Sequence, residues 1–126
     1  MGLLLDTHVV LEELAEGSTI GGKATAAIAA AEDLRVSVVS FIEIGIKASV
    51  GKLKIPEELH KLVLDSGARI LGLTPEHGLG VAALPLHHRD PFDRLLISQA
   101  RHEGLTILTS DPCFARYDVQ LIDATS

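Results

Sequence analysis

The chain has 126 residues, which is enough for one domain with a substantial core. Its formal net charge is −6, which argues against a protein that binds nucleic acid through a broad basic surface. Hydrophobic residues make up 47% of the sequence, yet no apolar run reaches the roughly 18–20 residues that a membrane helix requires, so we expect no membrane association.

Short apolar segments alternate with helical patterns along the chain. The first half predicts a strand at residues 3–5, a helix at 7–14, a loop at 17–22, a helix at 23–31, a strand at 35–39 and a helix at 40–49. The second half predicts helices at residues 56–64, from 74 and at 90–102, and strands at 68–73, 105–108 and 119–122.

This alternation predicts one α/β domain that spans residues 1–126. We expect a three-layer sandwich with a mainly parallel sheet of four to five strands and helices on both faces, because the strands are continuously apolar. The high hydrophobic content further predicts a homodimer that buries part of the apolar surface. The single cysteine, Cys113, excludes an internal disulfide and predicts a cytoplasmic location.

Four acidic residues stand at related positions in this pattern. Asp6 ends the first predicted strand, Glu43 lies in the first turn of the helix after the second strand, and Asp111 follows the fourth strand. Strand carboxyl ends and the helix starts that follow them share one edge of a parallel sheet, so these three should meet there. Asp93 can join them if the helix that carries it begins beside that edge.

Each acid also has a purely structural interpretation. Ser40 and Glu43 match a capping box, and Glu43 with Lys47 matches an i,i+4 ion pair. Asp90 and Asp111 each precede a proline, as helix N-caps often do. Singly, each acid is more often a cap than a ligand, but four carboxylates at one edge would repel one another and require a cation.

An all-carboxylate site suits magnesium, with manganese as the alternative ion, and its natural reaction is phosphodiester hydrolysis. A zinc site is disfavoured, because His77, His87 and His88 have neither a nearby cysteine nor the i,i+4 spacing of paired ligands. We expect His88 to help its loop hold its shape.

Four segments of the sequence resemble, in order, the conserved blocks of the PIN-domain toxins, which are the VapC ribonucleases of toxin–antitoxin pairs. They are Leu4-Leu5-Asp6-Thr7-His8, residues 40–53 from Ser-Phe-Ile-Glu to Gly-Lys-Leu, residues 88–96 with Asp-Pro-Phe-Asp-Arg at their centre, and residues 108–114 with Thr-Ser-Asp-Pro. The resemblance implies a PIN-like fold, RNA cleavage that depends on magnesium or manganese, and a small cognate antitoxin as partner.

The resemblance also implies roles for individual residues. It maps the metal-binding acids of the family onto Asp6, Glu43, Asp93 and Asp111. Other residues are expected to act around these acids: Asp90 as a helix cap or a support of the ligands, and Thr7 and Ser110 as hydrogen-bonding groups that orient carboxylates or metal-bound water. Independently of the resemblance, Lys47, Lys52 and Arg94 are weak candidates for contacts to RNA phosphates, with solvated surface charge as the default interpretation of each.

Three other functions compete with this one. A catalytically idle PIN-like interaction module would have the same fold and no metal-dependent cleavage, and a magnesium-dependent DNase would use the same acids. A phosphoryl-accepting receiver domain is disfavoured, because Asp6 lacks an acidic neighbour and Asp111 stands where a lysine is needed.

Overall fold

The computed structural model describes residues 1–15 and 20–126, so the first half of the loop predicted at residues 17–22 lies outside the described residues. The elements follow one another as β1 (Gly2–Leu5), α1 (Thr7–Ala15), α2 (Gly22–Ala30), β2 (Asp33–Ser37), α3 (Val38–Ser49), α4 (Leu59–Asp65), β3 (Arg69–Leu71), α5 (Pro75–Gly80), the short 3₁₀ helix η1 (Val81–Ala83), α6 (Pro91–Glu103), β4 (Thr106–Thr109), η2 (Pro112–Arg116) and β5 (Leu121–Asp123).

The five strands form one sheet in the order β3-β2-β1-β4-β5, and every neighbouring pair is parallel. The predicted α/β architecture with a parallel sheet is therefore confirmed. Strand order reverses beside β1, where β2 lies on one side and β4 on the other. In open parallel sheets, such a reversal leaves a crevice at the strand carboxyl ends where ligands bind. Asp6 directly follows β1 at this position.

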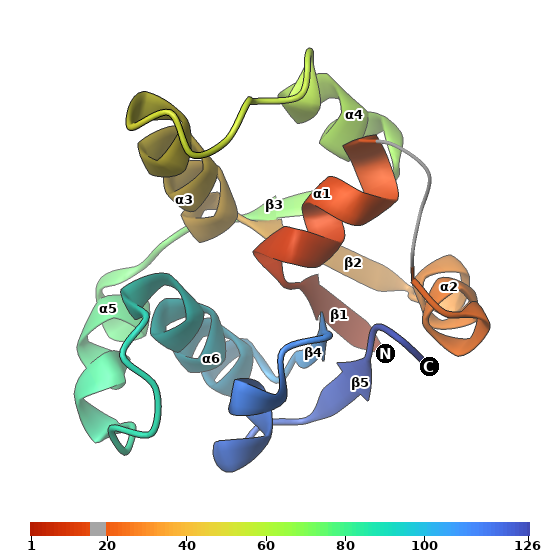
Figure 1. Cartoon of the computed structure of the whole chain (residues 1–126). Coiled ribbons are helices and arrows are strands. Elements are labelled where there is room, and N and C mark those ends of the chain that lie inside the picture. Colours follow the sequence, from red (N-terminus) through yellow and green to blue (C-terminus); the bar gives the residue numbers. More distant parts are fainter. Residues whose placement is uncertain (16–19) are drawn as a thin grey trace.

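Helices cover both faces of the sheet (Figure 1). Leu4 and Ile107 contribute to a hydrophobic core with α6, whereas the next residue on each strand, Leu5 or Leu108, contributes to a second core with α1, α2 and α4. This alternation follows from the period of two along a strand. Both faces of β1 and β4 are buried, which explains why their sequences are apolar without interruption.

Helix α3 begins two residues earlier than predicted. The Ser37 side chain caps it by accepting a hydrogen bond from the Val39 backbone N–H at 3.0 Å. The Ser40 hydroxyl instead pairs with Thr7 Oγ1 at 2.8 Å, so it caps nothing. The capping-box interpretation of Ser40 and Glu43 is therefore wrong, and Glu43 lies in the second turn of α3 rather than in the first.

Helix α4 begins at Leu59, three residues after the predicted start at Pro56. The residue before it, Glu58, has φ +55, a left-handed backbone conformation that cannot form part of a right-handed helix. The backbone N–H of Leu59 donates to the Pro56 carbonyl, which closes the turn that precedes the helix.

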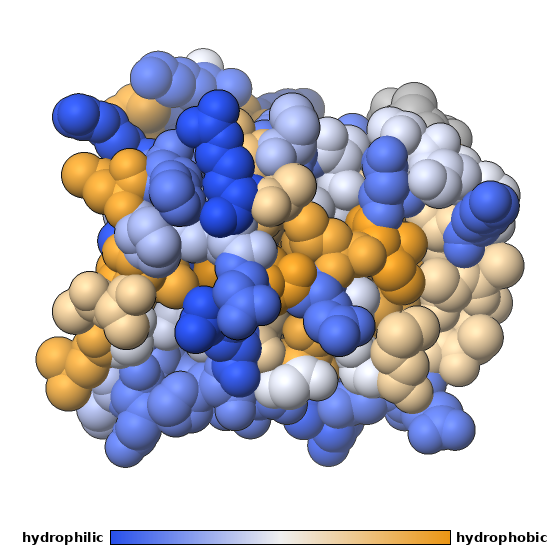
Figure 2. All heavy atoms as spheres, turned by 90° about the horizontal axis from the view of Figure 1, so that it is seen from below, coloured by the Kyte–Doolittle hydropathy of each residue, from blue (hydrophilic) through white to orange (hydrophobic). Residues whose placement is uncertain are grey.

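Large apolar side chains also reach the surface. Figure 2 shows such side chains gathered on one face of the molecule between charged ones. On α3, Ile42 and Ile46 are exposed four residues apart, so they share one side of the helix, and Val50, the residue that follows the helix, is exposed as well. Within the described part of the chain, none of the helices has the length and apolar character needed to cross a membrane.

Candidate metal centre

Asp6 is fixed at the carboxyl edge of the sheet by bonds to β4. Its backbone N–H donates to the Leu108 carbonyl at 3.0 Å, and Thr109 Oγ1 donates to Asp6 Oδ2 at 2.8 Å. The carboxylate is buried, and burial raises its pKa although the Thr109 bond opposes the shift. A buried carboxylate at this position can hold a cation more favourably than it can remain charged alone.

Glu43 offers an acceptor without a partner. Its side chain is only 4% exposed, and Lys47 Nζ donates to one carboxylate oxygen, Oε2, which also raises the pKa of Lys47. The other oxygen, Oε1, is buried and has no hydrogen-bond partner among the described residues. An unsatisfied buried acceptor costs roughly 1–3 kcal/mol, so this atom fits a ligand of a metal ion.

Asp93 is brought to the same edge by the start of α6. Asp90 caps this helix, because its Oδ1 accepts hydrogen bonds from the backbone N–H groups of Phe92 at 2.8 Å and Asp93 at 3.2 Å. The predicted cap role of Asp90 is therefore confirmed. Asp93 lies in the first turn of α6, as predicted, and is buried.

Burial raises the pKa of Asp93 to about 6. The negative charges of Asp90, Asp6 and Glu43 act in the same direction, and the hydrogen bond from His88 opposes it. Three of the four predicted acids, Asp6, Glu43 and Asp93, thus lie close enough to repel one another. This mutual repulsion is what a divalent ion would relieve.

Asp111 is connected to this group through Thr109. Its backbone N–H donates to Thr109 Oγ1 at 3.0 Å, and the same hydroxyl donates to Asp6. Asp111 Oδ1 accepts from the Cys113 backbone N–H at 2.9 Å, so the carboxylate also caps η2, as its structural interpretation predicted. Ser110, which was expected to orient a carboxylate, is exposed, and the hydroxyl that donates to Asp6 is that of Thr109.

Two other predicted residues act differently from expectation. The Thr7 hydroxyl pairs with Ser40 and thereby joins α1 to α3. The Arg94 guanidinium donates to the Tyr117 hydroxyl and to backbone carbonyls of residues 81–88. Arg94 therefore holds this segment in place, and its predicted contact with RNA phosphates stays a prediction.

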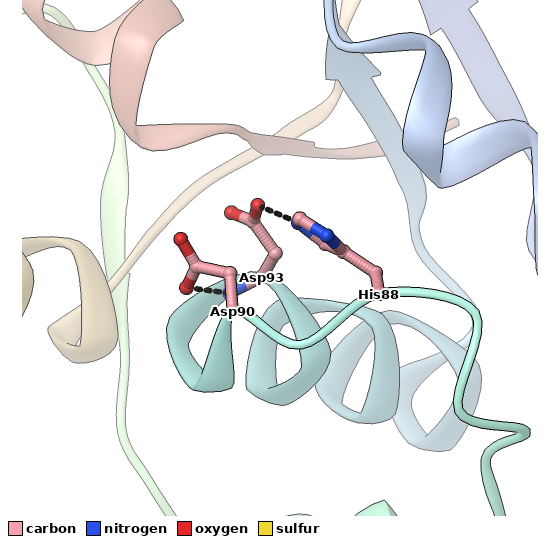
Figure 3. A group of neighbouring side chains, drawn as sticks. All are labelled: His88, Asp90 and Asp93. Carbon is pink, nitrogen blue, oxygen red and sulfur yellow. Dashed lines mark hydrogen bonds and ion pairs between the residues drawn. The ribbon is translucent and has the colours of Figure 1, made fainter.

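His88 is the site residue that the sequence did not reveal. Its Nε2 lies 2.7 Å from Asp93 Oδ2, and Figure 3 shows the ring directed at that carboxylate. His88, Asp90 and Asp93 each offer one potential ligand atom, and these atoms lie within 4.8 Å of one another. The signal available in the sequence was the position of His88 two residues before the helix cap Asp90. His77 belongs to a separate group, where it contacts Glu103.

A pocket of about 290 Å³ adjoins the acids on the α1–α3 side. It is lined by Glu43 together with the basic residues His8, Lys47 and Lys52. Two of the three cations predicted to contact RNA are therefore beside the acid group. The pocket thus places basic residues next to the acids. This arrangement suits a ligand with a row of phosphates, in which one phosphate lies at the acids and its neighbours lie against the basic residues.

The chain belongs to the PIN domain family, whose model matches residues 3–120. It is similar to Ribonuclease VapC22 of Mycobacterium tuberculosis, with 31% identity over 112 residues and 86% of each chain covered. The predicted resemblance is thus confirmed.

Solved structures agree on the fold. The structure of VapBC2 from Rickettsia felis bound to a DNA fragment from its promoter matches with a TM-score of 0.73 at 16% identity and 98% coverage of each chain. A toxin–antitoxin complex from Klebsiella pneumoniae matches with a TM-score of 0.59 at 15% identity and 87% coverage of each chain.

Proposed function

We propose that this protein is a divalent-metal-dependent endoribonuclease that acts as the toxin of a toxin–antitoxin pair, with magnesium as the ion and manganese as the alternative. The observation that carries the proposal is the buried Glu43 Oε1, which has no hydrogen-bond partner among the described residues, together with the negative charges of Asp6 and Glu43 that act on Asp93. Membership of the PIN family and the similarity to a protein named as a ribonuclease supply the reaction class.

Asp6, Glu43 and Asp93 would hold the ion, and Asp111 would complete the site directly or through water. A divalent ion at such a site polarises the phosphodiester and lowers the pKa of water. The residues of the chain provide the rest: Thr109 fixes the Asp6 carboxylate, and the Asp90 cap fixes the start of α6. Carboxylates held in this way need little rearrangement when they accept the ion.

Lys47 and Lys52 would bind RNA phosphates that flank the cleaved bond. Both line the pocket beside Glu43, and Lys52 is exposed. With only 3% aromatic residues in the chain, base stacking can contribute little to RNA binding, so phosphate contacts should dominate.

The test is cleavage of total RNA by the purified protein with magnesium, with manganese and with a chelator. We expect cleavage only with an ion, and a loss of at least about 100-fold in Asp6→Asn and Asp93→Asn, because each removes a charged ligand. Asp118→Asn, which alters an exposed carboxylate, is the matched control.

Each competing function predicts a different outcome. Wild-type activity in Asp93→Asn would exclude the proposed site. An idle interaction module predicts no ion-dependent cleavage by the wild-type protein. A DNase predicts that a DNA of the same sequence is cleaved in preference to the RNA, so both substrates are compared.

A small antitoxin is the proposed partner, because one solved structure with this fold is a toxin–antitoxin complex. Expression of the wild-type protein should arrest growth in the cytoplasm of a bacterial host, and expression of Asp93→Asn should not. Co-expression of the cognate antitoxin should restore growth. Arrest by Asp93→Asn equal to that by the wild type would contradict a nuclease toxin. We also propose a homodimer, for which Ile42 and Ile46 on α3, with Val50 directly after the helix, offer an exposed apolar surface.

A further inference from the structure

We propose that His88, Asp90 and Asp93 form a divalent-ion position in which the His88 imidazole is a ligand, so that this corner of the site prefers Mn²⁺ to Mg²⁺. The inference rests on the proposed function and deepens it, because it assigns a nitrogen ligand to a centre otherwise built from carboxylates.

The geometry brings three different donors to one point. The ligand atoms of His88, Asp90 and Asp93 all lie within 4.8 Å of one another, and His88 Nε2 is 2.7 Å from Asp93 Oδ2. Figure 3 shows the ring and both carboxylates on the same side of the start of α6. A single ion can contact donors that are separated in this way, since metal–ligand bonds are about 2.0–2.3 Å long.

The imidazole is held in place from two directions. The His88 backbone N–H donates to the Tyr117 hydroxyl at 2.9 Å, and its carbonyl accepts from Arg94 at 3.4 Å. Arg94 also donates to the Tyr117 hydroxyl at 3.2 Å, so the three groups brace one another. A loop histidine fixed at both backbone groups is preorganised to present its ring, as metal-ligating histidines are.

The carboxylates have oxygens available for an ion. Asp90 caps α6 through Oδ1, and the structure gives Oδ2 no hydrogen bond within the described residues. Glu43, whose charge acts on Asp93, supplies the separate observation that points to a ligand: its Oε1 is buried without a partner in the part of the chain that the structure describes.

The donor set determines which ion fits. Mg²⁺ is bound by oxygen and retains much of its water, whereas first-row transition ions accept imidazole nitrogen readily. One nitrogen together with two carboxylates therefore favours Mn²⁺ at this position. An all-carboxylate centre would not make this distinction through its donor atoms.

The experiment measures ion binding to the full protein, with Mn²⁺ as the probe. Electron paramagnetic resonance of free Mn²⁺ gives its Kd, and competition gives the Kd of Mg²⁺, for the wild type, His88→Gln and the matched control His87→Gln. His87 contacts the Tyr117 ring. We expect His88→Gln to weaken Mn²⁺ binding about 10–100-fold while the Kd of Mg²⁺ changes far less, and His87→Gln to retain the wild-type preference.

Pulsed electron paramagnetic resonance of the bound Mn²⁺ supplies a second readout. It reports directly whether an imidazole nitrogen binds the ion, which a merely structural role of His88 would not produce. Bound Mn²⁺ should show coupling to an imidazole ¹⁴N in the wild type and in His87→Gln, and the coupling should disappear in His88→Gln. Absence of the coupling in the wild type, its survival in His88→Gln, or equal weakening of both ions would overturn the inference. Cleavage of RNA by the wild type with Mg²⁺ tests the proposed function separately, so the two can fail independently.

Discussion

Asp93 is the residue at which burial and like charge act most strongly. In the fold its pKa is about 6, against 3.8 for an unperturbed aspartate. A raised pKa means that the folded state binds the proton more tightly than the unfolded state does. The cost of the charged carboxylate is therefore absent below about pH 4, grows between pH 4 and 6, and is fully present above pH 6.

Asp93→Asn should accordingly stabilise the protein when no metal is present. At pH 7 we expect the free energy of unfolding to rise by about 1–2 kcal/mol, a value reduced for partial solvent screening. The gain should shrink as the pH falls through 6 and vanish near pH 4. Urea denaturation across this pH range, in the presence of a chelator, measures it.

The exposed-site variant Asp118→Asn is the control and should show no such pH dependence. If Asp93→Asn were less stable than the wild type at pH 7, the raised pKa would be incorrect. The same substitution is expected to abolish cleavage, so stability and activity should change in opposite directions at this position.

Thr109 positions two acids with one hydroxyl, because it donates to Asp6 and accepts from the backbone of Asp111. Thr109→Val keeps the shape of the side chain and removes both bonds. We expect a loss of about 10–100-fold in ion affinity and cleavage, with about 1–3 kcal/mol lost in the free energy of unfolding. Calorimetric titration with Mn²⁺ measures the affinity.

Ser110→Ala is the matched control for Thr109→Val, since Ser110 is exposed. Equal ion affinity in the wild type and Thr109→Val would show that the hydroxyl does not position the acids. A larger effect of Ser110→Ala would instead support the role that the sequence suggested for Ser110.

At the residue scale, the sequence predicted the acids better than their supports. Asp6, Glu43 and Asp93 could be located because strand ends and helix starts are visible in the pattern. Thr109 could have been found from register, since Leu5 pairs with Leu108 and the following residues, Asp6 and Thr109, are therefore opposite each other. For His88 the only signal was its position two residues before the helix cap Asp90, because the path of a loop is not encoded in periodicity.

At the element scale, α3 determines where Glu43 lies. The helix starts after Ser37, and Ser37 Oγ also donates to Gln99 Oε1 of α6 at 2.5 Å. A single hydroxyl thus caps α3 and ties it to α6. Ser37 and Ser40 both stand near the predicted boundary, and the sequence suggested Ser40 as the cap. Only the tertiary partner of Ser37, Gln99, distinguishes the two serines.

Ser37→Ala should destabilise the protein more than the loss of an exposed cap would. It removes the cap and leaves the buried Gln99 carbonyl unpaired, so we expect a decrease of about 2–3 kcal/mol in the free energy of unfolding, measured by urea denaturation. Ser49→Ala, at an exposed position near the end of the same helix, is the control. A decrease no larger than the control's would exclude Ser37 as the cap.

At the scale of the whole molecule, the parallel sheet and its helix layers followed from the alternation of apolar strands and helices, and all five predicted strands are present. Element boundaries were less predictable. Strand β2 ends earlier than predicted because Ser37 caps the helix that follows it. Helix α4 begins later than predicted because Glu58, directly before it, has a left-handed backbone conformation. Such local geometry depends on neighbours that only the folded chain brings together.

The exposed stripe on α3 leads to a prediction about assembly. Ile46 is 49% exposed and lies on the same side of the helix as the exposed Ile42. If this side is the dimer interface, Ile46→Glu should place a charge in an apolar contact and weaken association by at least about tenfold. Light scattering after size-exclusion chromatography measures the mass, with Leu64→Glu on α4 as the control. A dimer of unchanged affinity would place the interface elsewhere.

The hydrogen bond between Thr109 and Asp6 joins residues 103 positions apart in the chain. During synthesis, Asp6 leaves the ribosome long before strand β4, which carries Thr109. Helix α6, which carries Asp93, also follows late. For the ribonuclease proposed above, this order of synthesis would be protective, because a nascent chain could not cut the message being translated until nearly the whole chain had emerged and folded.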